Sequence, residues 1–521
     1  MNDVSRRLWR SAAQSPALFI LMAHYSFAAN QTATLSPLQP ASNLPYRIQL
    51  TEVDYSNINL PTLHSYAAGT FDNKWVFISG RTNGLHGFDS VLAPEENFPI
   101  QSQNRDVWVV DLETKQSWTR PLDDPTSGLT ESQILSLAST NNQFYQRDDT
   151  LYLTGGYGVL ENGEDFSTFD ALSAIDLPGL GNWVMNGTGS AAAHIRQIHD
   201  PIFRVTGGAM HEIDGTTYLV FGQDFDGVYT PFSEGTYTRQ VRSFDIVDDG
   251  TNLSVANIAS TPIVADYKRR DLNIVPILAP DGVGGVEEKL VALSGVFTPT
   301  TGAWTVPVEI DANGQPTMAD PTAAATFKQG FNGYHSSKLG LFSEASGAMH
   351  EVLFGGISVQ FLNEVTGLVV TDNALPFVND ITSIQIDAAG NYTQHHMGYF
   401  PELFDTDNIR LRFGANSEFL IAGDIPVFDN GVIDFDQLAG GQTILGHIFG
   451  GIVTNGPHTR RGAASSGSNH VFAVSIILVP EPSTSMIIVG LAASVLICKR
   501  RLNHEQNSSF QRNGLYRSQN G

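Results

Sequence analysis

Five basic or imidazole side chains stand near the starts of short β-rich runs and are the first candidates for chemistry: His64, Arg204, Arg270, His335 and Arg412. If those runs are the inner strands of one closed array, their starts converge on a single mouth of a central channel. There they could hold a carboxylated sugar, because arginine binds carboxylates through two parallel hydrogen bonds. The alternative is that these side chains only satisfy hydrogen bonds between neighbouring sheets.

Aspartate-rich loops are the candidate cation sites, since alternating carboxylates in a turn supply the oxygen ligands that calcium prefers. The residues concerned are Asp224 and Asp226 in DFDG, and Asp405 and Asp407 in DTDN. Neither loop fits an EF-hand, and Asp, Asn and Gly also form ordinary turns. Two histidine pairs could bind a metal, but each lacks a third ligand and is more typical of surface or turn residues: His395 with His396, and His194 with His199.

Cysteine content and charge exclude several classes of function. The single cysteine, Cys498, lies in an apolar C-terminal run, so the rest of the chain has no disulfide, no cysteine-ligated metal and no thiol nucleophile. The net charge of −24 argues against nucleic acid as a partner, because phosphate binding needs clustered Lys and Arg. Gly-x-Ser-x-Gly, His-Glu-x-x-His and phosphate-loop motifs do not occur in the exported part.

The N-terminus has the pattern of a secretory signal peptide over residues 1–28. Arg6, Arg7 and Arg10 precede a short apolar segment, Ala17 to Tyr25, and small residues suited to a cleavage site follow at Ser26 and Ala28. We therefore expect export, and we take residues 29–45 as a linker.

The C-terminus has three parts in a fixed order. The rigid segment Val479-Pro480-Glu481-Pro482-Ser483 precedes an apolar run over residues 486–498, and Lys499, Arg500 and Arg501 follow. Because prolines fix φ and remove backbone donors, the segment stays extended and accessible. The apolar run predicts a transmembrane helix with its basic end in the cytoplasm. An ordinary C-terminal anchor, or a buried strand and helix, is the alternative.

This three-part end resembles the PEP-CTERM sorting signal of Gram-negative bacterial surface proteins, over residues 480–501. The resemblance implies recognition by an exosortase-type enzyme, a transient inner-membrane anchor that is then removed, and a final place at the cell surface or in an exopolysaccharide matrix. The polar tail 502–521 departs from the pattern, since such signals end soon after the basic cluster; its composition predicts disorder.

Between the two ends, one pattern recurs six times. A β-rich run ends in Gly-Gly or a small residue plus Gly, and a second run ends near an aspartate, as in DDTLYLTGG (148–156) followed by ALSAID (171–176). Trp118 and Trp183 are placed to open a fourth strand in their units. The units resemble degenerate kelch-type β-propeller blades over residues 46–479. This implies an all-β fold of six blades; seven blades, a β-sandwich pair or an irregular β-rich array are the alternatives.

The sixth unit lacks an outer strand, because Pro480 ends the run NHVFAVSIILV (469–479). The unpaired run YRIQLTEVD (46–54) precedes the first unit. We expect these two runs to pair, because pairing would close the ring and remove an exposed edge.

The sequence thus predicts an exported, non-enzymatic propeller that binds polysaccharide or a surface protein. A carbohydrate-active propeller enzyme of the epimerase or lyase type is the alternative, and a propeller that serves only as a spacer is a third. Some kelch-type propellers are copper radical oxidases, but their crosslinked cysteine has no counterpart outside the predicted anchor, which excludes that cofactor. Calcium remains a candidate, and no other cofactor is indicated.

Overall fold

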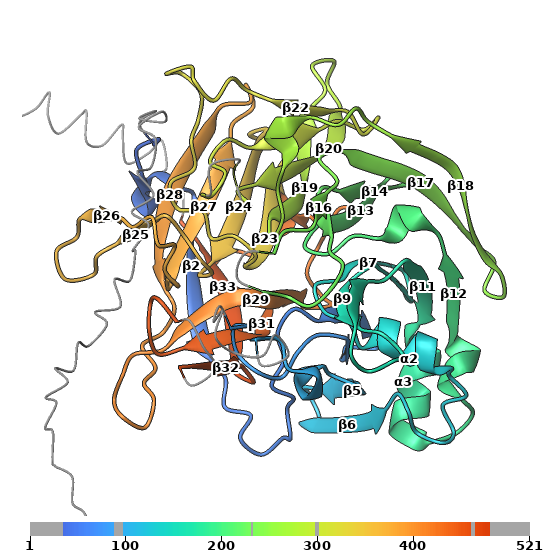
Figure 1. Ribbon diagram of the computed structural model, residues 1–521. Coiled ribbons are helices and arrows are strands. Elements are labelled where there is room, and N and C mark those ends of the chain that lie inside the picture. The colour runs from blue at the N-terminus through green and yellow to red at the C-terminus, as the bar shows by residue number, and fades with distance from the viewer. Residues whose placement is uncertain are drawn as a thin grey trace, which may run out of the picture.

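The computed structural model describes residues 35–87, 97–230, 233–296, 298, 302–459 and 464–479, and within them the protein is a β-propeller (Figure 1). Six sheets in this part of the chain have four or more strands. They stand radially around a central axis, and the colour in Figure 1 runs once round the ring. Two short helices, α2 (Glu131–Leu137) and α3 (Leu177–Asn186), accompany the first and second sheets.

The first four sheets are each built from consecutive antiparallel strands. The first has β3 (Ala67–Phe71), β4 (Lys74–Ile78), β5 (Asp106–Asp111) and β6 (Gln116–Pro121). The second has β7 (Gln143–Arg147), β8 (Thr150–Thr154), β11 (Ala171–Asp176) and β12 (Ile195–His199). The third has β13 (Ala209–Ile213), β14 (Thr216–Val220), β17 (Val241–Asp248) and β18 (Leu253–Ser260). The fourth has β19 (Asn273–Pro280), β20 (Val286–Leu293), β21 (Val308–Ile310) and β22 (Pro316–Met318).

The last two sheets carry additional strands. The fifth has β23 (Ser337–Ser343), β24 (Ala348–Phe354), β27 (Asp380–Ile386) and β28 (Tyr392–Tyr399), with β1 (Gln39–Pro40) and β30 (Ile433–Asp434) parallel at its two edges. The sixth has β29 (Arg412–Ile421), β31 (Gln442–Thr454), β33 (Val471–Leu478) and β2 (Tyr46–Glu52), with β32 (Ser465–Gly467) on β31. Three hairpins lie in the loops: β9 (Tyr157–Val159) with β10 (Phe166–Thr168), β15 (Gln223–Asp224) with β16 (Thr236–Tyr237), and β25 (Gln360–Leu362) with β26 (Val369–Thr371).

Local sequence explains the tight turns and the strand faces. Asp72 and Asn73 join β3 to β4 with φ of 45° and 60°, and Asp214 and Gly215 join β13 to β14 with φ of 49° and 81°. Two consecutive positive φ values give the turn whose twist matches that of a hairpin, and Asn, Asp and Gly tolerate them best. In β2 the apolar residues alternate with exposed ones, so one face of the strand is buried.

The core is divided among the interfaces between neighbouring sheets. Between the fifth and sixth sheets, for example, Leu341 and Phe354 pack with Leu445, Ile448 and Val474, and all five are at most 1 % exposed. Each such side chain contributes roughly 1.5–3 kcal/mol of hydrophobic free energy. Because every sheet needs two neighbours, the ring must close to bury all of these faces.

The prediction that Trp183 opens a fourth strand is wrong, because Trp183 lies inside α3. The side chain of Asp176 accepts a hydrogen bond from Gly179 N at 3.2 Å and so caps the helix. Gly187, with φ 67°, ends it. Trp183 is fully buried in the core shared by the first two sheets. Trp118, in contrast, lies in the fourth strand of its sheet, β6, as expected.

The predicted closure is present. β2 pairs antiparallel with β33, with Tyr46 opposite Leu478 and Glu52 opposite Phe472. The residues before β2 are also fixed to the propeller. Ser36 exchanges backbone and side-chain hydrogen bonds with Lys328, and β1 pairs with β28. An N-terminal strand therefore supplies the outer edge of the last sheet.

The predicted signal peptide (1–28), the sorting signal (480–501) with its helix over 486–498, and the tail (502–521) lie outside the described residues. In the part of the chain that the structure describes, none of the helices has the length and apolar character needed to cross a bilayer.

Candidate functional site

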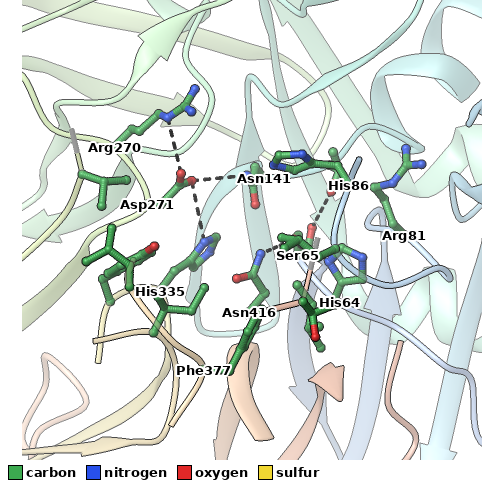
Figure 2. Close-up of a pocket in the computed structure, with 18 of the residues that line it drawn as sticks. His64, Ser65, Arg81, His86, Asn141, Arg270, Asp271, His335, Phe377 and Asn416 are labelled. Atoms are coloured by element: carbon green, nitrogen blue, oxygen red, sulfur yellow. Dashed lines mark hydrogen bonds and ion pairs between the residues drawn. The ribbon is translucent and has the colours of Figure 1, made fainter. Parts of the chain in front are cut away.

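A cavity of about 640 Å³ lies at the end of the ring where the first strand of each sheet begins (Figure 2). One residue near this end of each of the six sheets has a left-handed backbone, with φ between 48° and 66°: Ser65, Asn141, Gly207, Asp271, His335 and Asn416. Five of them stand two residues before their first strand. In the sixth sheet the ring residue, Asn416, lies within β29, after an irregularity between Arg412 and Ala415.

Backbone hydrogen bonds join these six residues into a ring. The N–H groups of Asn141, Gly207, Asp271, Asn416 and Ser65 each donate to the carbonyl of the preceding ring member, at 3.2, 3.2, 2.8, 2.6 and 3.1 Å. Between Asp271 and His335 the side chain of Asn273 replaces the direct bond, through Gly333 O at 2.7 Å and Ser336 N at 3.1 Å. A left-handed backbone costs a non-glycine residue roughly 1–2 kcal/mol. The ring bonds offset this cost and fix where the five side chains point.

A second layer of the cavity comes from the residue that follows the closing glycine of each second strand. In four sheets this residue lines the cavity: Arg81, Val296, Ile357 and Ile452. In the other two, Tyr157 and Gln223 line an adjoining recess of about 70 Å³. Short β-bridges tie several of them to the residue before the ring position, as in His64 with Arg81 and Arg270 with Val296.

Arg81 is the most unusual group in this layer. It is 2 % exposed, and its guanidinium carbon lies 3.7 Å from the centroid of the Phe98 ring. Nε donates to Asn83 Oδ1 at 3.0 Å and Nη2 to Pro99 O at 2.8 Å, whereas Nη1 is buried and has no hydrogen-bond partner among the described residues. Burial lowers the pKa of Arg81 to about 9, so the group remains charged at neutral pH. No carboxylate in the described part of the chain forms an ion pair with it.

Three of the four histidines that line the cavity, His64, His86 and His335, are uncharged at neutral pH. Burial, reinforced by the charge of Arg81, lowers the pKa of His64 to about 3. The backbone of Asn83 opposes this shift. His64 Nδ1 lies 3.0 Å from Ser65 Oγ. Burial also lowers the pKa of His86 to about 4 and that of His335.

Asp271 supplies the one carboxylate among the described residues that line the cavity. Its oxygens lie 3.4 Å from Arg270 Nε, 3.8 Å from His335 Nδ1 and 3.4 Å from Asn141 Nδ2 (Figure 2). Burial opposes the charge of Arg270, but Asp271 and Tyr237 together raise its pKa. The positive charge of Arg270 therefore has a counter-ion, whereas that of Arg81 has none among the described residues.

Three of the five channel residues predicted from the sequence line the cavity, and two do not. His64, Arg270 and His335 line the same cavity. Arg204 does not line it, because its guanidinium pairs with Asp224 at 3.1 and 3.2 Å. Arg412 also lies away from it, at the irregular start of β29, and donates to Arg410 O at 3.3 Å. Sequence reasoning missed Arg81, Asn141, Asp271 and Asn416. Their signal is positional: each stands directly after a closing glycine or at the left-handed position.

Most of the candidate metal ligands are engaged within the protein. Asp224 pairs with Arg204, and the backbone of Asp226 bridges to Ser167. Asp405 accepts hydrogen bonds from the backbones of Asp407 and Ile409. The histidine pairs are engaged as well: His396 with Asp380, His395 with Pro40 O, His194 with Asp176, and His199 with Asp170. In the described ranges no three His, Cys, Asp or Glu side chains are grouped so as to hold a metal ion.

Comparisons with known proteins add little to this site. No protein-family model matches the chain, and no curated protein matches it. A solved structure titled "Structure of YjhT" aligns with 12 % identity over 80 % of this chain and 96 % of that chain, with a TM-score of 0.40. A likeness of this size says nothing about function.

Proposed function

We propose that the protein is an exported propeller that binds acidic polysaccharide, with the carboxylate of one sugar unit held by Arg81 in the channel-end cavity. The single observation behind this proposal is the buried Arg81 guanidinium, whose Nη1 has no hydrogen-bond partner among the residues that the structure describes. Removing a charge from water without an opposite charge is unfavourable by several kcal/mol. The Phe98 ring offsets part of that penalty, and a ligand carboxylate that reaches Nη1 after a small movement of the cavity wall would offset the rest with a charge-assisted hydrogen bond.

The remaining walls suit a sugar ring. Asn141 lines the cavity, and its Oδ1 is buried without a hydrogen-bond partner in the described part of the chain, so a small shift of the wall would let it accept a hydrogen bond from a sugar hydroxyl. On the other side Ile357, Leu375 and Phe377 provide an apolar surface. Cavities of this size, mostly apolar with a few placed polar groups, are typical of small-molecule sites.

We further propose that the six sheets count as six blades and that the protein is sorted through its Pro-Glu-Pro segment. β33 begins beside the Gly451 end of β31, near the cavity, and runs eight residues away from it to Leu478. At about 3.3 Å per residue, Val479 lies roughly 25 Å from the cavity end of that sheet. An anchor that follows Val479 would hold the propeller with its cavity facing away from the membrane.

A carbohydrate-active enzyme is the second candidate, and one observation favours it. Asp271 and His335 form an acid–imidazole pair, 3.8 Å apart, inside the cavity. Such a pair could move a proton at a bound sugar, provided that the gap closes toward hydrogen-bond distance when the ligand enters.

One screen separates the two candidates. The purified protein is incubated with acidic and neutral polysaccharides, and both retention of the polymer and the appearance of new reducing ends or shorter chains are measured. We expect retention of acidic polymers with unchanged chain length. Turnover that disappears in His335→Ala and His64→Ala would replace the binding proposal with the enzymatic one. If the protein shows no retention and no turnover, the result would support a propeller that serves only as a spacer.

A further inference from the structure

A second, smaller hollow lies on the outer rim, away from the channel. It has a volume of about 500 Å³ and lies between β21 and β22 of the fourth sheet, the segment 325–327, and the turn that leads into β28 of the fifth sheet. β21 and β22 have only three residues each, whereas β27 and β28 of the neighbouring sheet have seven and eight. The short outer strands therefore leave room that the neighbour does not fill.

An aromatic pair forms one wall of this rim groove. The rings of Phe327 and Tyr392 stack with centroids 5.5 Å apart and planes at 24°. The Tyr392 hydroxyl donates to Glu309 Oε1 at 2.8 Å and so joins the fifth sheet to the fourth. Burial and the nearby Glu309 raise the pKa of Tyr392, which keeps this hydroxyl a donor. Among the described residues Glu309 Oε2 accepts no hydrogen bond, so it remains an acceptor for a ligand.

The segment that carries Phe327 is held open by the chain around it. Lys328 Nζ donates to Ala323 O at 2.8 Å and to Thr326 O at 3.2 Å, and its backbone exchanges hydrogen bonds with Ser36. Thr326 Oγ1 donates to Asp320 O at 2.6 Å. The wall is therefore fixed from both sides and does not collapse onto the groove.

The polarity of the groove selects its ligand. None of its lining residues is basic, and Glu309 carries the one charge among them. An anionic ligand would be repelled by that carboxylate. Small residues such as Ala319, Ala325 and Gly390 leave space beside the aromatic wall. An aromatic face with a carboxylate acceptor suits a molecule that has a C–H face and hydroxyl donors at its edge, which is the chemistry of an uncharged pyranose ring.

We propose that this rim groove, formed by Phe327, Tyr392 and Glu309, binds a neutral sugar unit. The site is distinct from the channel-end cavity and has the opposite charge preference. A polysaccharide with both acidic and neutral units could occupy the two kinds of site on neighbouring molecules, and this would raise the effective affinity through multivalency.

The experiment is saturation-transfer NMR on the purified protein, with methyl glycosides of glucose, galactose and mannose as the probes. We expect transfer to the protons of one sugar face for at least one probe, its loss in Phe327→Ala, and its weakening in Tyr392→Phe. Phe404→Ala, which removes a half-exposed ring elsewhere, is the matched control and should change nothing. Arg81→Gln should also leave the signal intact, so this test does not depend on the channel-end proposal.

Three results would overturn the assignment: no transfer to any neutral probe, transfer that survives Phe327→Ala, or, in the Arg81→Gln protein, stronger transfer to glucuronate than to the neutral sugars. Tyr392→Phe keeps the stacked ring and removes only the bond to Glu309. If Phe327→Ala does not fold, Tyr392→Phe provides the test, and unchanged transfer in Tyr392→Phe would overturn the assignment.

Discussion

The guanidinium carbon of Arg81 lies over the Phe98 ring, 3.7 Å from its centroid, and the group is buried and without a carboxylate partner among the described residues. In the same cavity Arg270 is paired with Asp271. Two arginines that face one cavity thus differ in charge compensation, and only Arg81 gains a counter-ion when an anion enters. This difference gives the cavity its predicted preference for acidic ligands.

The left-handed ring predicts a specific glycine effect. In Gly207→Ala a new Cβ would lie 2.9 Å from Asp271 Oδ1 and 3.3 Å from Arg270 Cβ, in addition to the penalty of φ +66°. Gly215→Ala has a similar φ penalty, with φ +81°, but meets nothing within 4 Å. We expect Gly215→Ala to lower the free energy of unfolding by about 1 kcal/mol and Gly207→Ala to lower it further. Equal losses in urea denaturation would show that the contact with Asp271 is unimportant.

Ring closure predicts a graded series at Tyr46. This side chain is fully buried, and its hydroxyl lies 2.8 Å from Ser383 Oγ across the fifth–sixth interface. Tyr46→Ala should lower the free energy of unfolding by about 3–5 kcal/mol, as for other large aromatic truncations. Tyr46→Phe should lower it by about 1 kcal/mol, and the exposed neighbour change Arg47→Ala by less than about 0.5 kcal/mol. If Tyr46→Ala behaved like Arg47→Ala, β2 would not be closing the ring.

The buried histidines predict that the protein loses folding stability as the pH falls below neutral. Burial lowers the pKa of His64 to about 3 and that of His350 to about 4. Between those values and about 6.5 the unfolded chain binds protons that the folded chain does not, so stability is lost as the pH falls through this window. His350→Gln should flatten that loss in thermal unfolding measured from pH 7 to pH 4. Thr51→Gln, at an exposed position without a titratable group, should leave it unchanged.

Glu351 has the opposite effect on the pH dependence of stability. It is fully buried, neither carboxylate oxygen has a partner in the described part of the chain, and burial raises its pKa well above the ordinary value. The folded state therefore keeps a proton that the unfolded state releases above about pH 4.5, and stability falls as the pH rises toward the folded pKa. We expect Glu351→Gln to stabilise the protein at pH 8 more than at pH 5. An equal effect at both values would mean that Glu351 is already ionised in the fold.

Salt should affect polymer and monomer binding differently. The net charge of −24 repels an acidic polymer over distances that salt screens, whereas the contact at Arg81 is buried and screened less. Raising the salt concentration from 20 to 150 mM should therefore strengthen retention of an acidic polysaccharide, with little change for the single sugar acid. Weaker retention at the higher salt would point to a basic surface as the binding site.

Much of the fold could be predicted from local patterns. The alternation in YRIQLTE, the turn at Asp72 and Asn73, and the halt at Pro480 predict strands, a hairpin and a missing outer strand, because each depends on neighbouring residues alone. The position of Trp183 could not be predicted from local patterns. It lies in a helix capped by Asp176 and Gly187, and the place of that helix in the core depends on contacts with two sheets.

The site could be predicted only in part for a related reason. His64, Arg270 and His335 stand at the starts of first strands, which a repeat pattern can locate. Arg412 does not line the cavity, because the irregularity in β29 shifts the ring position to Asn416. Arg204 does not line it, because its guanidinium forms an ion pair with Asp224. The proposed role of Arg81 depends on the lack of a partner for Nη1 among the described residues, and only the packed structure reveals that.

The most direct measurement is calorimetric titration of the purified protein with hexuronic acids and with the matching neutral hexoses. We predict that the wild-type protein prefers at least one acid over its neutral counterpart by tenfold or more, about 1.4 kcal/mol. Arg81→Gln should abolish that preference, Arg81→Lys should restore part of it, and Arg204→Gln should leave it unchanged. An unaltered preference in Arg81→Gln, or no preference in the wild-type protein, would contradict the assignment of Arg81 as the carboxylate-binding residue.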